Sequence, residues 1–426
     1  MKRPRVRRAC PINEGFEGER DELSDERVEA LIRRFRDKQA LIAVIGLGYV
    51  GLPLSLAASG VGFSVLGFDS NADRVKDLNA GKSPLKHIGH DLIASTRAEK
   101  RFEATAQFER LGEADAILIC VPTPLGRHRE PDLSYVESTS RTIARELRRA
   151  QLVILESTTY PGTTKEIVKP ILESTGLRSG LDFFLAYSPE REDTGNLDFQ
   201  TSQIPKVISG DGSAALALAR AMYEQFVVRT IPVSSLETAE AVKLTENIFR
   251  AVNVALVNEL KVVYSAMGVD IFEVIEAAKT KPFGFMPFYP GPGLGGHCIP
   301  IDPFYLTWKA RALGISTRFI ELAGEINTSM PAYVINRLRE ELDRRFSKGL
   351  SGSRILVVGL AYKKNVDDIR ESPALTIIEE LERIGANVAY YDPYLPVVPQ
   401  SRRHGAIARK PSVPPLSLYY AVSTRL

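Results

Sequence analysis

The sequence predicts an α/β protein with a doubly wound parallel sheet at its N-terminus, a central all-helical domain and a second, apparently truncated α/β unit. Three features of the 426 residues indicate this class. Short apolar strands alternate with helical stretches from residue 41 to residue 232, and a glycine-rich turn follows the first strand. A weak copy of the same strand–helix–strand pattern returns near residue 354. Such alternation is typical of parallel sheets covered by helices.

The first 40 residues are interpreted as an N-terminal extension. Residues 1 to about 20 carry many basic residues and no hydrophobic period, so we expect them to be disordered. Residues 24–36 open with a capping signal and have apolar positions on one helix face. These positions are Val28, Leu31, Ile32 and Phe35. We therefore predict a short amphipathic helix ahead of the first domain.

The first domain is expected to span residues 41–232. The segments predicted to form buried strands are 41–45, 64–68, 116–121 and 152–156, with a helix at 50–58 after the first strand. Each strand segment is a short apolar run bounded by turn residues, and helical stretches separate the runs. This order predicts a doubly wound sheet whose strands run parallel.

A helical domain is predicted for residues 233–346. Residues 238–267 are expected to form one long helix, and further helical stretches run from about residue 271 to residue 345. The apolar residues of the long helix are Val242, Ile248, Val252, Leu256 and Val263. An apolar stripe of this kind is compatible with pairing of two copies of the chain.

A second α/β unit is expected at residues 353–395, after a polar, glycine-containing linker at 347–353. Its two predicted strands, at 354–362 and 386–392, echo the first two strands of the N-terminal domain. The second copy lacks the full glycine pattern, so it need not bind a dinucleotide.

The last segment, residues 396–426, contains no acidic residue, several prolines and no clear strand or helix period. We expect an irregular tail there, and therefore a shortened third domain.

Composition excludes several classes of function. The net charge of +3, with basic residues interspersed among acids, gives no reason to expect nucleic acid as a partner. No apolar run approaches the roughly 18–20 residues of a membrane span. Cys10, Cys120 and Cys298 lie far apart and lack metal-ligand spacing, which favours free thiols in a reducing compartment. We expect a cytoplasmic protein without a metal centre.

A glycine motif predicts a dinucleotide site. Gly46, Gly48 and Gly51 fit the GxGxxG spacing between a strand and a helix, and Asp69 closes the next strand near the expected offset. The glycines give a tight turn, close approach of the backbone to a pyrophosphate, and helix–sheet packing. Asp69 favours NAD over NADP, because a carboxylate repels a ribose phosphate. Arg74 weakens that preference slightly, since it can contact a phosphate. A glycine turn without a ligand is the alternative.

The segment 291–303 places Cys298 between a glycine-rich loop and a predicted helix start. Asp302 is expected to be the N-cap of that helix, and Pro303 suits its first position. A thiol near a helix N-terminus is favoured as thiolate, so we interpret Cys298 as a nucleophile rather than a buried cysteine. His297 is expected to contact substrate rather than to pair with the thiol.

Lys243 and Asn247 are four residues apart on the long predicted helix and share a face. A solvated face is the simple interpretation. The apolar neighbours of Lys243 instead suggest that both side chains point inward and stabilise a developing oxyanion. Asp302 could also orient the thiol or a water.

Polar groups follow two of the predicted strands. Cys120 is interpreted as core packing at the end of its strand, with Pro122 and Thr123 just beyond, where ligands bind in open α/β sheets. The hydroxyls of Ser157 and Thr158 could face cofactor or substrate, or cap the next helix.

Together these motifs resemble the UDP-glucose/GDP-mannose dehydrogenase family over residues 25 to 395. The segments that carry the resemblance are 45–53, 120–124, 156–158, 188–191, 243–247, 290–302 and 362–372. Segments 188–191 and 295–300 are similar to the branch that acts on UDP-N-acetylhexosamines. Segments 281–285 and 302–306 favour UDP-N-acetylglucosamine as substrate, with UDP-N-acetylmannosamine or UDP-glucose as alternatives.

The resemblance implies a Rossmann-type NAD domain and a four-electron oxidation of the sugar's primary alcohol to a carboxylate. It implies that Cys298 captures the aldehyde as a thiohemiacetal, and that a thioester forms and is hydrolysed. Lys243 and Asn247 would stabilise the oxyanion, and Asp302 would assist proton transfer. Thr158 would position a water, and Glu190 is a candidate base.

The resemblance also implies binding residues and partners. The expected cofactor contacts are Gly46, Gly48, Tyr49, Val50, Gly51, Asp69, Arg74, Pro122, Thr123, Ser157 and Thr158. The expected substrate contacts are Glu190, Arg191, Lys243, Asn247, Gly295, Gly296, His297, Lys364 and Arg370. A homodimer through the central helices is expected. Two alternatives stay open, namely a hydroxyacid dehydrogenase that does not need Cys298, and an NAD-binding remnant that fails to bind UDP-sugar because its third domain is shortened.

Overall fold

The computed structural model describes residues 26–85, 88–126, 129–191, 201–296 and 299–396. Three of the expectations above lie outside these residues. They are the disorder of residues 1–20, the placement of His297 and Cys298, and the irregular tail beyond residue 396.

An eight-stranded sheet forms the N-terminal part, with the strand order β3-β2-β1-β4-β5-β6-β7-β8. Its strands are β1 Leu41–Ile45, β2 Ser64–Phe68, β3 Phe102–Thr105, β4 Ala116–Ile119, β5 Leu152–Leu155, β6 Phe184–Tyr187, β7 Lys206–Gly210 and β8 Thr230–Pro232. The first six strands run parallel, which confirms the predicted doubly wound sheet. β7 runs antiparallel to β6, a reversal common near the edge of such sheets.

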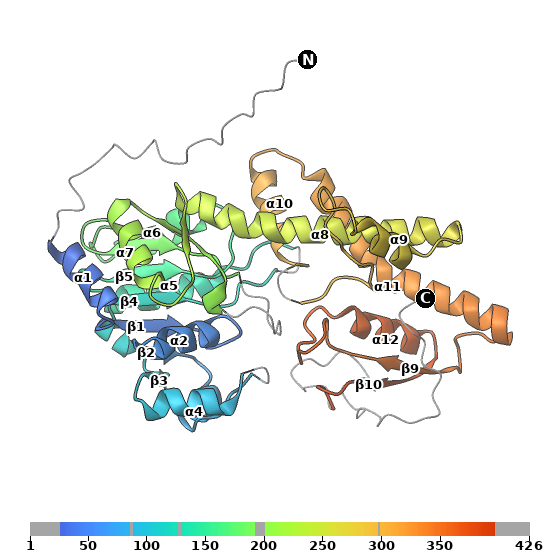
Figure 1. Ribbon diagram of the computed structural model, residues 1–426, viewed down its shortest axis with the longest axis horizontal. Helices are drawn as coiled ribbons and strands as arrows, with labels where there is room; N and C mark the ends of the chain where they lie inside the picture. Colours follow the sequence, from blue (N-terminus) through green and yellow to red (C-terminus); the bar gives the residue numbers. More distant parts are fainter. Residues whose placement is uncertain (1–25, 86–87, 127–128, 192–200, 297–298, 397–426) are drawn as a thin grey trace, which may run out of the picture.

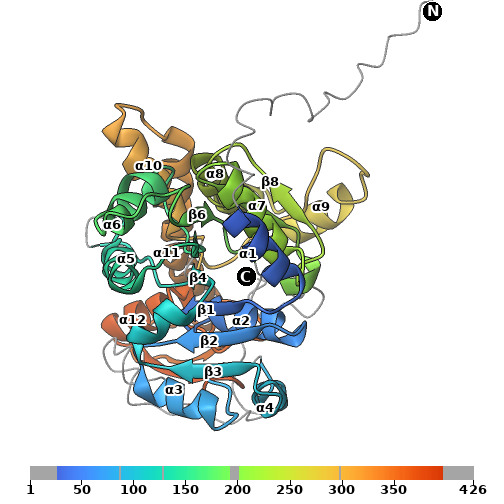
Figure 2. The ribbon, with the colours of Figure 1, turned by 90° about the vertical axis from the view of Figure 1, so that its left-hand side faces the viewer.

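Helices cover both faces of the sheet. They are α1 Glu26–Arg36, α2 Gly51–Gly60, α3 Ala72–Asn79, α4 His90–Ala98, α5 Ser134–Glu146, α6 Lys169–Glu173 and α7 Ser213–Tyr223, with short helices η2 Phe108–Glu113, η3 Thr164–Val168 and η4 Thr201–Gln203. α5 and α6 lie on one side of the sheet, and α1 and α7 on the other (Figure 2). Alternate residues of β1 enter the two cores, Ile42 and Val44 one, Ala43 and Ile45 the other.

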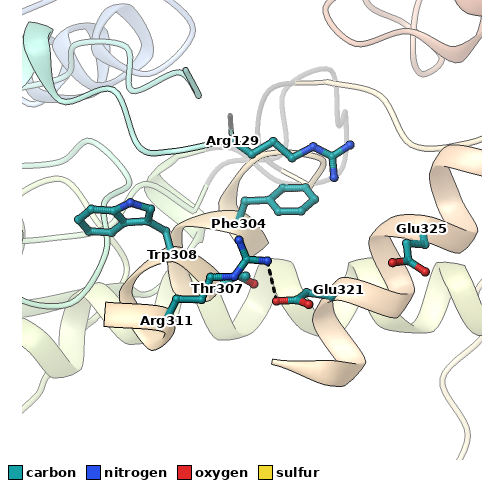
Figure 3. A pocket seen from close by; sticks show the side chains of 7 residues that line it. All are labelled: Arg129, Phe304, Thr307, Trp308, Arg311, Glu321 and Glu325. Carbon is teal, nitrogen blue, oxygen red and sulfur yellow. Dashed lines mark hydrogen bonds and ion pairs between the residues drawn. The ribbon is translucent and has the colours of Figure 1, made fainter. Parts of the chain in front are cut away.

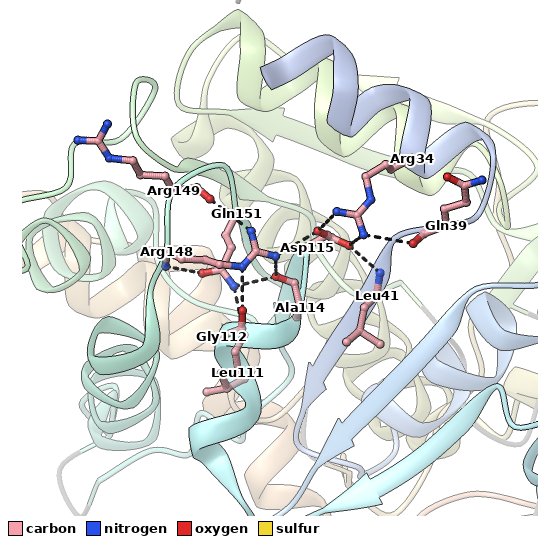
Figure 4. A network of polar contacts seen from close by, with 10 residues as sticks. All are labelled: Arg34, Gln39, Leu41, Leu111, Gly112, Ala114, Asp115, Arg148, Arg149 and Gln151. Atoms are coloured by element: carbon pink, nitrogen blue, oxygen red, sulfur yellow. Dashed lines mark hydrogen bonds and ion pairs between the residues drawn. The ribbon is translucent and has the colours of Figure 1, made fainter. Parts of the chain in front are cut away.

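A buried carboxylate fastens the predicted N-terminal helix to the sheet (Figure 4). Asp115, 2% exposed, accepts hydrogen bonds from Arg34 Nη1 at 2.7 Å, Arg148 Nη2 at 3.1 Å and the Leu41 amide at 2.9 Å. Because these bonds lie where β1 and β4 begin, at the opposite end from the expected ligand site, the network has a structural role.

Two long helices dominate the central part. They are α8 Leu236–Ala266 and α11 Arg318–Phe346, accompanied by α9 Ile271–Ala278 and α10 Asp302–Ala312. α8 runs from the sheet toward α9 and α11, and so links the two halves of the molecule (Figure 1). The predicted apolar stripe of α8 is only partly buried, since Leu256 is 53% and Val263 40% exposed. The buried face instead carries polar residues, among them Lys243 and Asn247.

The second α/β unit contains β9 Arg354–Val358, α12 Pro373–Arg383 and β10 Asn387–Tyr391. β9 and β10 pair in parallel, as the internal repeat predicted. Their core includes Ile335 and Leu338 of α11, so this unit packs directly on the central helices. No helix among the described residues has the length and apolar character that crossing a membrane requires.

Candidate active site

The glycine turn after β1 has the geometry that a dinucleotide needs. Gly46 has φ +93°, and a Cβ there would lie 2.6 Å from the carbonyl oxygen of Cys120. A Cβ at Gly51 would lie 2.0 Å from the carbonyl oxygen of Gly46. A Cβ at Gly48 would meet no protein atom within 4 Å. Gly46 and Gly51 therefore leave no room for a side chain. The space at Gly48, just before the start of α2, is open, and a pyrophosphate fits there.

Asp69, directly after β2, is held in place by three polar contacts. Its Oδ2 accepts the amide of Leu47 at 3.0 Å, and its Oδ1 accepts the amide of Asn71 at 2.9 Å. Arg74 Nη1 lies 2.9 Å from Asp69 Oδ2. The guanidinium therefore pairs with Asp69, which agrees with a preference for NAD over a phosphorylated cofactor.

Substitution of two glycines should separate cofactor binding from folding. We expect Gly48→Val to raise the KM for NAD roughly tenfold or more with an unchanged melting temperature, because only the cofactor occupies that space. Gly51→Ala should instead destabilise the fold by about 1–3 kcal/mol, because its Cβ meets backbone. Steady-state kinetics and thermal melting of both variants check this. Equal loss of stability in both would contradict it.

Polar and aromatic groups order the loops at the carboxyl ends of β4 and β5. Ser157 Oγ donates to the carbonyl oxygen of Val121 at 2.7 Å, which joins the two strand ends rather than capping a helix. The hydroxyl of Tyr305, on α10, donates to the carbonyl oxygen of Thr123. Cys120 is half-buried against the core, as predicted. Thr158, the residue after Ser157, is also half-buried.

The buried face of α8 gathers the predicted catalytic side chains. Lys243 is 3% exposed and Asn247 fully buried, so the alternative of a solvated face is wrong. Lys243 Nζ lies 3.3 Å from Glu190 Oε2. Asn247 donates through Nδ2 to Asp302 and accepts at Oδ1 from Arg250. Two predicted oxyanion stabilisers and two predicted proton-transfer groups therefore form one buried cluster.

Asp302 does not cap α10, contrary to prediction. It is the first residue of α10, and the N-cap position falls on Ile301, which makes no side-chain cap. The carboxylate is 1% exposed and turned toward Asn247. Burial raises the pKa of Asp302 from 3.8 to about 7, and the Lys243 ammonium opposes that shift. A carboxyl group with such a pKa exchanges protons readily near neutral pH.

The segment before Cys298 is anchored at two points, Gly291 and Gly296. Asn258 Oδ1, on α8, accepts the amide of Gly291 at 2.9 Å, and Asn258 Nδ2 donates to Asn327 of α11 at 2.9 Å. The amide of Gly296 donates to the carbonyl oxygen of Arg370 at 2.8 Å. These bonds fix residues 291–296 against α8 and the last α/β unit.

Tight packing explains the glycines predicted to contact substrate. A Cβ at Gly295 would lie 2.5 Å from Tyr362 Cβ, and one at Gly296 would lie 2.8 Å from the Tyr362 ring. The Arg370 guanidinium lies 5.0 Å from the centre of the Tyr49 ring, so the last unit touches the cofactor turn. Arg370 also pairs with Asp368 at 2.6 Å.

Two other predicted substrate residues have different surroundings. Arg191 pairs with Glu246 Oε1 at 2.6 Å and donates to the carbonyl oxygen of Pro205 at 2.6 Å, so it fastens its own loop. Lys364 is exposed, in the segment between β9 and α12.

Two pockets adjoin these elements. One is lined by Val50, Leu54, Glu156, Glu190, Arg191, Ile204, Pro205 and Lys206, and lies between the start of α2 and the Glu190 loop. The other lies between α10, the start of α11 and Arg129, and is lined by Arg129, Phe304, Thr307, Trp308, Arg311, Glu321 and Glu325 (Figure 3). Only the first contains predicted site residues. No group of three metal-ligating side chains occurs among the described residues.

Sequence reasoning missed Glu240, which joins α8 to the loop after β5. Its carboxylate is fully buried and accepts the amides of Gly162 at 2.6 Å and Thr164 at 2.8 Å, together with the Thr164 hydroxyl at 2.7 Å. Glu240 lies three residues before Lys243 on the same helix face, and this spacing could have predicted that Glu240 is buried as well. Through its hydrogen bonds Glu240 holds α8 against the segment that follows β5.

Glu240 should give the protein a pH-dependent stability. Burial raises the pKa of Glu240 from 4.5 to about 7. Between these values the folded state holds a proton that the unfolded state releases, so stability falls as pH rises through this window. The parent protein should lose unfolding free energy between pH 5 and pH 7.5, and we expect Glu240→Gln to make this loss smaller by up to about 3 kcal/mol. Urea unfolding at both pH values measures it.

The control for this prediction is Glu237→Gln. Glu237 lies one turn earlier on α8 and forms a partly exposed pair with Lys165 at 3.4 Å. This variant should keep the pH slope of the parent protein. The same slope in the Glu240→Gln variant would show that Glu240 is not protonated in the folded state.

A dinucleotide turn close to a buried cluster of lysine, asparagine and aspartate indicates a dehydrogenase that uses a nicotinamide dinucleotide. Comparison with known proteins agrees. Models of the UDP-glucose/GDP-mannose dehydrogenase family match residues 40–227 as the NAD binding domain, 237–329 as the central domain and 356–415 as the UDP binding domain.

Relatives of known identity cover most of the chain. A UDP-N-acetyl-D-glucosamine 6-dehydrogenase of Pseudomonas aeruginosa is 38% identical over 84% of each chain. A UDP-N-acetyl-D-mannosamine dehydrogenase of Pyrococcus horikoshii is 39% identical over 83% of this chain and 84% of its own. The solved structure of the UDP-D-ManNAc dehydrogenase from that organism has a TM-score of 0.78, 38% identity and the same coverage. The chain belongs to the UDP-glucose/GDP-mannose dehydrogenase family and is an NAD-dependent UDP-sugar dehydrogenase.

Proposed function

We propose that this protein oxidises the primary alcohol of UDP-N-acetylglucosamine to a carboxylate, with Cys298 as covalent nucleophile. The observation that carries the proposal is the buried cluster of Lys243, Asn247 and Asp302, of which Asp302 lies four residues after Cys298 in the sequence. The Pseudomonas relative named for this sugar, and the hexosamine-type motifs, support the choice of substrate. The Pyrococcus relative favours UDP-N-acetylmannosamine as the second candidate.

The cofactor turn fits NAD, as the open space at Gly48 and the fixed carboxylate of Asp69 indicate. Bound NAD supplies the hydride acceptor for each of the two oxidations. Gly46, Gly48 and Gly51 would hold the pyrophosphate at the start of α2, and Asp69 the ribose. Thr123 and Ser157, at the neighbouring strand ends, complete the wall of the site.

The residues on α8 would act on the sugar oxygen. In the first oxidation the hydroxyl at C6 loses its proton and C6 loses a hydride, which gives an aldehyde. Lys243 and Asn247 stabilise negative charge on that oxygen, because a buried ammonium and amide interact strongly with an oxyanion. Asp302, with a pKa near neutrality, takes up the proton.

Cys298 then makes the second oxidation feasible. Its sulfur adds to the aldehyde carbon, the oxygen gains a proton, and a thiohemiacetal results. Loss of that proton and of a second hydride leaves a thioester, whose hydrolysis by water releases the carboxylate and restores the thiol. Glu190 would deprotonate that water, and Thr158 would orient it.

We infer that two copies of the chain pair through the central helices. Exposed apolar residues on α8 and α11 support this, with Leu256 53%, Phe319 78% and Leu322 51% exposed. Sedimentation velocity at micromolar concentration tests the inference, and a monomer would contradict it.

Comparison of the activity with three UDP-sugars identifies the substrate. Values of kcat/KM measured from NADH absorbance with UDP-N-acetylglucosamine, UDP-N-acetylmannosamine and UDP-glucose should be highest for the first. A higher value for either alternative would replace the proposed substrate. No turnover with any of them, in a folded sample that binds NAD, would favour a remnant without UDP-sugar activity.

A further inference from the structure

A buried lysine lies outside the set of catalytic groups discussed so far. Lys206, the first residue of β7, is 8% exposed. Its ammonium donates to Glu156 Oε2 at 2.5 Å and to the carbonyl oxygen of Pro189 at 3.3 Å. Glu156 is fully buried and also accepts from the hydroxyl of Tyr223. Burial raises the pKa of Glu156, and the Lys206 ammonium opposes that shift.

Each partner of Lys206 adjoins a loop with a proposed catalytic group. Glu156 immediately precedes Ser157 and Thr158, and Pro189 immediately precedes Glu190. The ion pair therefore lies where two loops begin. One loop carries Thr158, which would position the water, and the other carries Glu190, the proposed general base. The ion pair also lines the pocket beside the cofactor turn.

Other bonds attach the Glu190 loop to the same strand. Ser188 Oγ donates to the carbonyl oxygen of Val207 at 2.8 Å, and Arg191 Nη1 donates to that of Pro205 at 2.6 Å. These two bonds hold the loop to β7 without Lys206. Lys206 joins the Glu190 loop to the Glu156 side chain, and the Ser188 amide, which donates to the carbonyl oxygen of Leu155 at 3.1 Å, joins the same loop to β5.

We propose that Lys206 and Glu156 are a positioning pair, which holds Glu190 and Thr158 at the spacing required for one water to attack the thioester. The proposal rests on the proposed function. A buried ion pair is a poor source of stability, since its desolvation offsets most of the attraction, and neutral replacements of similar size are often tolerated. Misplacement of catalytic groups by about 1 Å, in contrast, can cost on the order of 100-fold in rate.

The test is the double variant Glu156→Gln/Lys206→Met, which removes both charges together and keeps a hydrogen-bond acceptor for Tyr223. Stopped-flow NADH absorbance and intact-mass spectrometry during turnover separate the oxidations from hydrolysis. We expect the first NADH per active site to form at the parent rate. The steady-state rate should fall roughly 10- to 100-fold, and the sugar adduct on the protein should accumulate.

Two further variants serve as controls for this test. Lys206→Arg retains the cation and should stay within about threefold of the parent rate, because Arg can reach the same acceptors. Lys169→Met is the matched control. Lys169 pairs with Asp211 just beyond the other end of β7, at 2.7 Å, without contact to either catalytic loop, and its loss should leave all phases unchanged.

The outcomes separate this inference from the proposed function. An unchanged steady-state rate in the folded double variant would overturn the positioning role, as would an equal fall in all phases without adduct accumulation. Failure of the parent protein itself to form NADH with any of the three UDP-sugars would instead overturn the proposed function.

Discussion

Replacement of Cys298 by alanine should slow formation of the second NADH per sugar at least about 1000-fold, because in the proposed cycle the second oxidation needs the covalent bond that the thiol forms. Without the thiol the aldehyde has no route to a thioester, so any residual activity should stop at one NADH per sugar. NADH absorbance at saturating UDP-sugar and NAD measures the loss.

Cys120→Ala is the matched control. Cys120 is half-buried, lies beside Gly46 of the cofactor turn and packs against the core. Its removal should leave kcat within about threefold of the parent value, since it reacts with nothing in the proposed cycle. Formation of two NADH per sugar at the parent rate in Cys298→Ala would contradict covalent catalysis by this thiol.

Lys243→Met should lower kcat about 100- to 1000-fold, the equivalent of about 3–4 kcal/mol of transition-state stabilisation. Lys243 is 3% exposed and pairs with Glu190, so the variant removes a positive charge from a dry site. The KM for the sugar should change less than kcat, because the charge it opposes develops during reaction. Steady-state kinetics over a range of UDP-sugar concentrations measures both.

Lys261→Met on the same helix provides the comparison. Lys261 lies over the ring of Phe272 at 5.8 Å, away from the buried cluster, and its substitution should leave kcat unchanged. A Lys243→Met variant that raises KM alone would show that the ammonium binds the ground state and does not stabilise the oxyanion.

The parallel sheet was predictable from the sequence in part, through its strands β1, β2, β4 and β5, whereas β3, β6, β7 and β8 were not predicted. β1 and β2 occupy the predicted residues, because short apolar runs between turn residues leave little choice of register. The reversal of β7 was not predictable, since the apolar pattern of a strand does not record its direction. The N-terminal helix was predictable from the spacing of its apolar residues. Three of them, Val28, Leu31 and Phe35, are buried in the core that α1 shares with α7.

The candidate site was predictable in composition but not in its connections. Lys243 and Asn247 could be placed on one face by their spacing, and their burial followed from apolar neighbours. The N-cap prediction for Asp302 was wrong because residue preference takes no account of a tertiary partner, here Asn247. The Glu156–Lys206 pair joins residues 50 apart in sequence, and no local pattern shows such a contact.

The stoichiometry of NADH tests the central claim most directly. With UDP-N-acetylglucosamine limiting, NAD in excess and the reaction run to completion, the covalent four-electron mechanism predicts two NADH per sugar and a uronic acid product. One NADH per sugar, with an aldehyde or keto product, would contradict the mechanism and the role assigned to Cys298.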